Sequence, residues 1–220
     1  MPWRRYATLP PMSTTPLFQI AAGILAGVFI YYGMDIRRKD GALNLVAPVW
    51  QTLMKLCSFS LIAAFVWITL HMREASGGDW MDLAVMASGT AFVAAAKRAL
   101  GKAHTFTGQC LQRPGLVTGG VYAMTRNPLY FGVLQCEVGA AMFVVHQALI
   151  LLPGPQYLIG VLTIALLYAV SFNWNMAKRE AGYMHRHFGE EYQRYRNRVP
   201  FVFPLIRPLI RLLRLRKEIQ

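Results

Sequence analysis

The residues best suited to chemistry gather in the stretch YAMTRNPLYFG, residues 122–132, and around Glu180 further along the chain. Arg126 and Asn127 stand directly before Pro128, and proline is favoured in the first turn of a helix because its missing amide costs nothing there. A glycine-rich segment that runs into a helix start leaves backbone amides that can bind a carboxylate or another anionic group. The alternative is an ordinary interfacial turn, in which the two tyrosines of the stretch anchor the helix at a membrane surface.

Two carboxylates belong with this stretch. Glu180 follows a long apolar run that is expected to return to Arg126, where it could pair with that arginine or hold a cationic ligand. Glu137 lies within the apolar run that starts at Pro128, and an ionisable residue at membrane depth usually faces a bundle interior or a cavity. A neutral glutamic acid that fixes helix packing is the alternative for Glu137.

The composition places these residues in a membrane. The chain has 220 residues, of which 55% are hydrophobic and 15% charged, whereas a soluble domain has about 25% charged residues. The net charge of +13 also suits a nucleic-acid-binding protein, but the long uncharged runs favour a basic membrane protein, and the basic stretch 203–220 lacks the aromatic interleaving that single strands need. The uncharged runs therefore argue against a nucleic-acid partner. The five histidines show no metal-binding spacing, so we expect no metal either.

The elements that must position the site are helices. We expect an all-α integral membrane protein of about five transmembrane helices, with a C-terminal helical hairpin and a cytoplasmic helical cap. Residues 153–155, PGP, break the last apolar run into the two arms of the hairpin. An N-terminal region, 1–113, is expected to hold spans 16–34, 50–72 and 80–98, and a catalytic region, 114–220, the hairpin 128–151 and 156–177.

The distribution of charge predicts the orientation of these spans. Twenty of the 23 lysines and arginines lie in the segments 35–55, 97–127 and 178–220. By the positive-inside rule these segments are cytoplasmic, so the N-terminus lies outside and the C-terminus in the cytoplasm. The last residues, 203–220, read as a basic amphipathic helix that lies on an anionic membrane surface.

The segment after the hairpin, residues 179–204, predicts a cap over the open end of the hairpin. A short helix is expected to stop at Phe188-Gly189, and a second helix to end before Val199-Pro200.

Two separated blocks of sequence together resemble a known family. The order G-x-Y-x-x-x-R-N-P-x-Y-x-G, then a hairpin, then E-x-x-x-M-x-x-x-F-G-x-x-Y-x-x-Y-x-x-x-V-P, resembles the isoprenylcysteine carboxyl methyltransferase and phospholipid methyltransferase superfamily over about residues 114–204. The matching residues are Gly120, Tyr122, Arg126, Asn127, Pro128, Tyr130, Gly132, Glu180, Met184, Phe188, Gly189, Tyr192, Tyr195, Val199 and Pro200.

This resemblance implies an integral-membrane enzyme that uses S-adenosyl-L-methionine to methylate a lipid or another lipophilic acceptor, in what resembles a bacterial inner-membrane protein. Arg126 and Glu180 are the implied catalytic residues, and Glu137 and Met176 the residues expected on the acceptor side. The implied cofactor-binding residues are Leu116, Val117, Gly120, Tyr122, Asn127, Pro128, Leu129, Tyr130 and Glu180.

The chain also departs from the family pattern. Asn127 stands where histidine is usual, Pro114-Gly115 replaces a histidine-asparagine pair, and Ala181 replaces a second glutamate. Met176 occupies the position of an arginine that binds the substrate carboxylate in the prenylcysteine enzymes, which argues against a prenylcysteine acceptor. The sequence leaves two alternatives open: a membrane reductase that uses NADPH and has a similar C-terminal hairpin, and a non-enzymatic membrane scaffold.

Overall fold

A computed structural model describes residues 14–33, 42–101, 109–112 and 114–204. Within these ranges the chain is mostly helical with very little strand, and five of its helices are long and apolar enough to cross a membrane. The predicted all-α membrane fold is therefore confirmed, while the expected amphipathic tail lies outside the described residues. The elements are α1 (Thr15–Gly33), β1 (Ala42–Asn44), α2 (Pro48–His71), α3 (Gly77–Leu100), β2 (Gln109–Leu111), α4 (Val121–Met124), α5 (Pro128–Leu151) and α6 (Gln156–Arg198).

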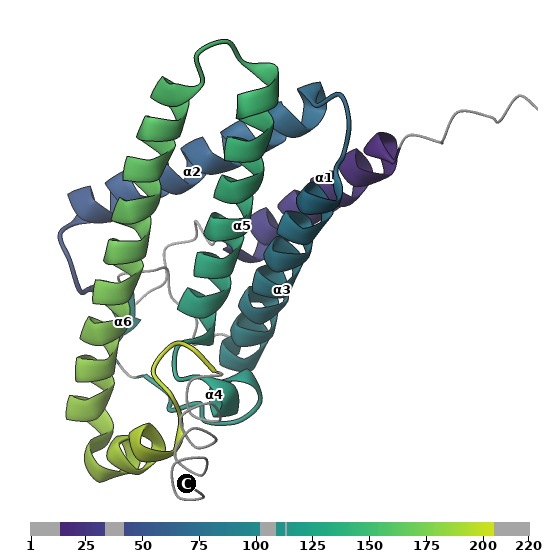
Figure 1. Cartoon of the computed structure of the whole chain (residues 1–220). Coiled ribbons are helices and arrows are strands. Elements are labelled where there is room, and N and C mark those ends of the chain that lie inside the picture. Colours follow the sequence, from purple (N-terminus) through teal and green to yellow (C-terminus); the bar gives the residue numbers. More distant parts are fainter. Residues whose placement is uncertain (1–13, 34–41, 102–108, 113, 205–220) are drawn as a thin grey trace, which may run out of the picture.

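The C-terminal hairpin consists of α5 and α6, with its turn at one end of the molecule and α4 near the other (Figure 1). Pro128 is in the first turn of α5, as predicted, and Gly154 takes the positive φ of 68° that the turn requires. The polar segment up to Phe188 continues α6 without a break, and the residues after Gly189 form a second helical stretch. Gly189, with φ 51° and ψ −121°, interrupts the helical backbone at the predicted stop and redirects the chain.

The helices α3 and α5 pack against each other through glycines. A Cβ atom built on Gly89 would lie 2.5 Å from the carbonyl oxygen of Gly132, and one on Gly132 equally close to the carbonyl oxygen of Gly89. Further along α5, a Cβ atom on Gly139 would lie 2.9 Å from the carbonyl oxygen of Asp82. Small residues at a helix interface allow this close approach, which positions the first turn of α5 relative to the end of α3.

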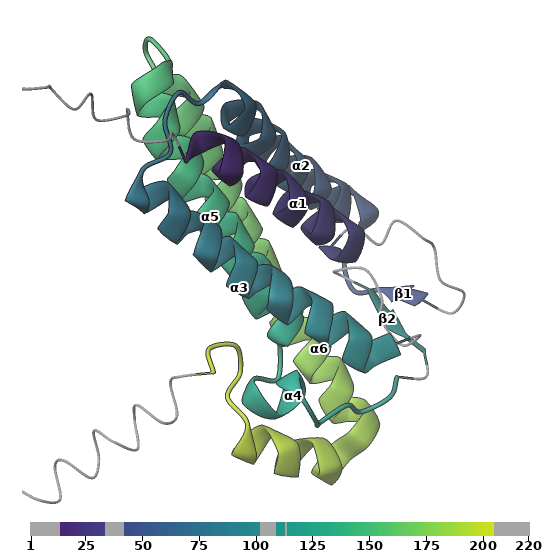
Figure 2. The same cartoon turned by 90° about the vertical axis from the view of Figure 1, so that its right-hand side faces the viewer.

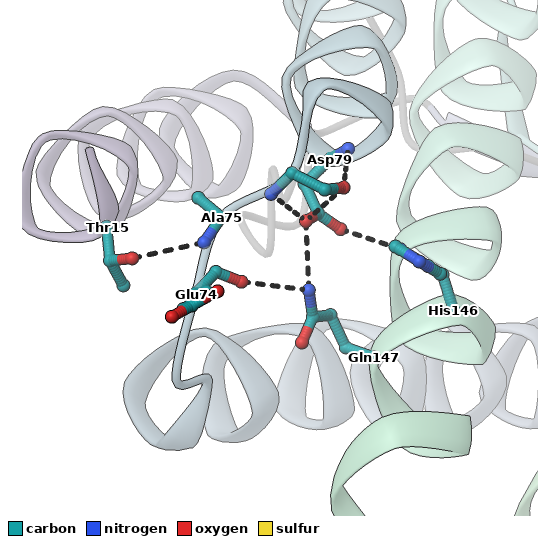
Figure 3. A network of polar contacts seen from close by, with 7 residues as sticks. Thr15, Glu74, Ala75, Asp79, His146 and Gln147 are labelled. Atoms are coloured by element: carbon teal, nitrogen blue, oxygen red, sulfur yellow. Dashed lines mark hydrogen bonds and ion pairs between the residues drawn. The ribbon is translucent and has the colours of Figure 1, made fainter. Parts of the chain in front are cut away.

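A polar network joins the same two helices near the turn of the hairpin (Figure 3). Asp79 is fully buried and caps α3, since its Oδ2 accepts a hydrogen bond of 2.7 Å from the Ser76 amide. The same oxygen accepts 2.9 Å from Nε2 of Gln147, and Oδ1 lies 3.0 Å from Nδ1 of His146, both on α5. A buried carboxylate is tolerated here because each of its oxygens has a partner.

A short antiparallel ribbon, β1 with β2, is the one element type that the sequence did not predict (Figure 2). It is attached to the polar half of α6: Tyr183 Oη donates to the Leu111 carbonyl at 2.9 Å, and Arg179 to the Leu45 carbonyl at 3.0 Å. The ribbon therefore lies at the open end of the hairpin, where the polar candidates for chemistry are found.

Candidate functional site

A polar cavity of about 130 Å³ lies where α5 begins and where α6 leaves its apolar stretch. Its walls come from the end of α3, from β2, from the segment that leads into α5, and from α6 on both sides of the Gly189 kink. The residues that line it are Leu100, Gln109, Cys110, Leu111, Pro114, Gly115, Val117, Tyr122, Arg126, Asn127, Leu129, Tyr130, Glu180, Ala181, Met184, Tyr192 and Tyr195.

The Arg-Asn pair of the first sequence block binds the backbone of the second block. The Arg126 amide donates to the Pro200 carbonyl at 2.9 Å, and its Nε to the Val199 carbonyl at 3.1 Å. Asn127 donates from Nδ2 to the Phe201 carbonyl at 2.7 Å. These three bonds give a physical reason for the pairing of the two motifs, because they fold the chain after α6 back onto the entrance of α5.

Two tyrosines complete the connection. Tyr130 Oη of α5 donates to Glu180 Oε1 of α6 at 2.5 Å, and Tyr195 Oη donates to the Tyr122 carbonyl at 2.7 Å. Among the described residues Glu180 thus bonds to Tyr130, while Arg126 bonds to backbone carbonyls, so the two do not form an ion pair. Of the two roles the sequence left open for Glu180, pairing with Arg126 is excluded in this structure.

The electrostatics of the cavity are governed by Glu180, which lies beyond the apolar span of α6. Burial raises the pKa of its carboxyl from 4.5 to about 7, although the hydrogen bond from Tyr130 acts in the opposite direction. Burial, and secondarily the nearby Glu180, raises the pKa of the Cys110 thiol to about 12 and also raises the pKa of Tyr122. A cation bound in the cavity would favour the ionised carboxylate and so lower its pKa again.

The cavity brings together most of the residues that the sequence singled out. Those that line it are Val117, Tyr122, Arg126, Asn127, Leu129, Tyr130 and Glu180. The backbone at Gly120, with φ 59°, opens the short helix α4, which positions Tyr122.

The other candidates lie outside this lining. Leu116 packs behind the wall with Tyr192 and Tyr195, and Pro128 is buried in the first turn of α5. Met176 is 3% exposed and packs in an apolar cluster that includes Tyr130. Glu137 lies deeper, in a separate cavity beside α2.

Several residues that line the cavity could not have been identified from the sequence. Leu100 reaches the cavity because α3 ends there, and the strand Gln109–Leu111 because it pairs with β1, more than 60 positions earlier. Met184, Tyr192 and Tyr195 belong to the second motif block, but the motif alone does not indicate that they line the cavity.

The described residues contain no group of three or more histidine, cysteine, aspartate or glutamate side chains that could hold a metal ion. What this part of the chain presents is a carboxylate, an arginine, an asparagine and four tyrosines around one cavity at the end of a transmembrane hairpin.

This combination defines a helical membrane protein with a polar site at the open end of its last two spans. The phospholipid methyltransferase family matches residues 80–191, just over half of the chain, and the chain belongs to that family. The match begins in α3 and includes the hairpin, Arg126 and Glu180, whereas the first two spans precede it. No curated protein matches the chain. The protein is thus a membrane methyltransferase by family.

Proposed function

We propose that this protein transfers a methyl group from S-adenosyl-L-methionine to a lipophilic acceptor that resides in the bilayer. The observation that supports this most directly is the position of Glu180, a partly buried carboxylate without a cationic partner among the described residues, in a cavity that opens at the end of the membrane hairpin. Membership of the phospholipid methyltransferase family supports the same reaction and disfavours the NADPH-dependent reductase and the scaffold.

The residues present suit such a cofactor. Its sulfonium and ammonium groups are cationic, and a partly desolvated carboxylate stabilises a cation better than a fully hydrated one does. The aromatic faces of Tyr122 and Tyr130 line the same cavity and are suited to cation–π contact or stacking. When bound, the cofactor supplies an already activated methyl group, so the task of the chain is to position the reactants and exclude water.

We assign the individual roles as follows. Glu180 binds the cofactor, and Arg126 orients the cofactor or acceptor from a position secured by its bonds to residues 199 and 200. The cofactor-binding set is otherwise the one named from the sequence: Leu116, Val117, Gly120, Tyr122, Asn127, Pro128, Leu129 and Tyr130. Met176 and Glu137 belong to the acceptor side, with residues 114–220 as the catalytic region and the cavity on the cytoplasmic face of a bacterial inner membrane.

Calorimetric titration of the purified, detergent-solubilised protein with S-adenosyl-L-methionine tests the proposal. We expect saturable binding to the wild type, and weakening by at least tenfold in a variant that combines Asn127→Ala with Glu180→Gln, since each removes a polar contact. NADPH is the control ligand and is expected not to bind. A folded wild type that binds no S-adenosyl-L-methionine, or a double variant that binds it as well as the wild type, would contradict the proposal.

A further inference from the structure

A second polar point lies deeper in the bundle than the candidate cofactor cavity. Glu137 follows Tyr130 by seven residues on α5, so the two share one face of the helix and lie about 10 Å apart along it. The Glu137 side chain is 5% exposed. Its Oε1 accepts a hydrogen bond of 3.2 Å from Ser58 Oγ of α2, whereas its Oε2 has no hydrogen-bond partner among the described residues.

Two apolar cavities meet at this carboxyl. One of about 40 Å³ lies among α1, α2, α3 and α5, and another of about 10 Å³ lies between α2, α5 and α6. Glu137, Ser58 and Leu61 line both. The smaller cavity is bounded on α6 by Leu166 and its neighbours, and the adjacent Leu167 is exposed on the outside of the bundle. Glu137 is therefore the polar point of an apolar slot that approaches the lipid-facing surface between α2 and α6.

The surroundings determine which atom of the carboxyl bears a proton. An isolated charge in hydrocarbon is too costly, so the carboxyl is neutral at this depth. Because Oε1 accepts from Ser58, the proton resides on Oε2, which then requires an acceptor. A neutral oxygen on a hydrocarbon chain both suits the apolar lining and accepts this hydrogen bond.

We propose that Glu137 binds a neutral oxygen, of a carbonyl or hydroxyl group, carried on the chain of the methyl acceptor about 10 Å from the methylated atom. This inference rests on the proposed function, which puts the reacting head of the acceptor near Tyr130 and Glu180. The chain of the acceptor then follows α5 into the bilayer and enters the slot sideways between α2 and α6.

Asn173 supports this path from the opposite helix. Asn173 precedes Glu180 by seven residues on α6, and Glu137 follows Tyr130 by seven residues on α5. Tyr130 and Glu180 bond to each other across the hairpin. Asn173 is 4% exposed, and neither its amide nitrogen nor its amide oxygen has a hydrogen-bond partner among the described residues. Ala169, one helical turn deeper, lines the smaller cavity with Glu137. The antiparallel arms thus carry two incompletely bonded polar side chains at similar depth.

The test uses two synthetic lipids with the same primary-amine head and the same chain length. One carries an ester carbonyl about 10 Å from the nitrogen, and the other has methylene groups in its place. Binding of each lipid to the purified full chain is measured by quenching of tryptophan fluorescence, and methyl transfer to each is measured separately with radiolabelled cofactor. The variants are Glu137→Leu, Glu137→Gln and, as the matched control, Gln135→Leu, whose Oε1 also has no partner among the described residues but which lines neither cavity.

We expect the wild type to bind the ester lipid about tenfold more tightly than its methylene analogue, the value of one buried hydrogen bond. Glu137→Leu should abolish this preference, and Glu137→Gln should keep it, because an amide nitrogen can still donate. Gln135→Leu should also keep it. Equal binding of both lipids to the wild type, or an unchanged preference in folded Glu137→Leu, would overturn the inference. A clear lipid preference in a protein that binds no S-adenosyl-L-methionine by calorimetry would support the lipid site and refute the proposed function, so the two failures can be told apart.

Discussion

The Glu180 carboxyl binds its proton more tightly in the folded chain than in the unfolded chain, because burial raises its pKa from 4.5 to about 7. Between those values the folded state holds more protons, so this group makes the free energy of unfolding decrease as the pH rises from about 4.5 to about 7. We expect the melting temperature of the cofactor-free wild type to fall over this range by more than that of Glu180→Gln. Thermal melts of both proteins in detergent between pH 4.5 and 8 measure the difference, and parallel curves would contradict the raised pKa.

Binding of a cationic cofactor should show the opposite dependence on pH. The ionised carboxylate is the form that attracts a cation, so affinity should rise with pH and level off above about 7, with a slope of roughly tenfold per pH unit below it. Tyr130→Phe removes the hydrogen bond that lowers the Glu180 pKa, so the midpoint should move to higher pH. Tyr195→Phe is the matched control, because its hydroxyl bonds to the Tyr122 carbonyl rather than to Glu180. Calorimetry across pH measures the midpoints, and equal midpoints in all three proteins would show that the ionisation of Glu180 does not set the pH dependence of binding.

At the scale of the elements, the contact between α3 and α5 depends on glycine. In Gly89→Ala the new Cβ atom would meet the backbone carbonyl oxygen of Gly132 at 2.5 Å, and a backbone atom cannot move aside as a side-chain end can. We expect the two helices to separate and the free energy of unfolding to fall by about 2 kcal/mol, the usual scale of overpacking. Gly160→Ala on α6 is the control, because nothing lies within 4 Å of its Cβ position. Denaturant unfolding of both variants should show a loss only in the first.

The polar network around Asp79, at the other end of α3, is also expected to stabilise the packing of α3 against α5. Asp79→Ala removes the acceptor for the Ser76 amide, for His146 and for the buried Gln147, which keeps only its longer bond to the Glu74 carbonyl (Figure 3). We expect a loss of about 3 kcal/mol in the free energy of unfolding. Glu74→Ala is the control and should cost little, since the Glu74 side chain is exposed and only its backbone carbonyl accepts from Gln147. Similar melting temperatures for the two variants would show that the network contributes little.

At the scale of the whole molecule, the helices could be predicted because their signals are local. Uncharged runs of about 20 residues, Pro128 at a helix start and PGP at a turn each act through a few neighbouring residues. The residues of the two motif blocks could also be placed near each other, because a hairpin with a short turn returns its second arm to the start of its first.

The remaining parts of the site depend on contacts that leave no pattern in a single sequence. Arg126 and Asn127 bind the backbone carbonyls of residues 199–201. Because every residue has a backbone carbonyl, the sequence does not mark which ones will serve as acceptors. The ribbon pairs strands of three residues, too short for the alternation that marks a strand. Glu137 could be located within a span, but its partner Ser58 lies 79 positions away on a helix whose rotation the sequence does not specify.

The orientation of the whole molecule decides whether the cavity can meet a cytoplasmic cofactor. Twenty of the 23 lysines and arginines lie in the sequence segments 35–55, 97–127 and 178–220, and the described parts of these segments lie at the cavity end of the spans. By the positive-inside rule that side should be cytoplasmic and the turn of the hairpin, at residues 152–155, should be outside. Two single-cysteine variants test this: Gln156→Cys beside the turn and Glu190→Cys beside the kink of α6, both at exposed positions.

In both variants the native Cys57, Cys110 and Cys136 are replaced by serine or alanine so that only the new thiol reacts. A membrane-impermeant maleimide applied to intact spheroplasts should label Gln156→Cys, and should label Glu190→Cys only after the membrane is permeabilised. Labelling in the reverse pattern would put the cavity on the outer face, out of reach of cytoplasmic S-adenosyl-L-methionine. The fold and the family assignment do not depend on orientation, so that result would not affect them. It would contradict the proposal that the cavity binds S-adenosyl-L-methionine from the cytoplasm.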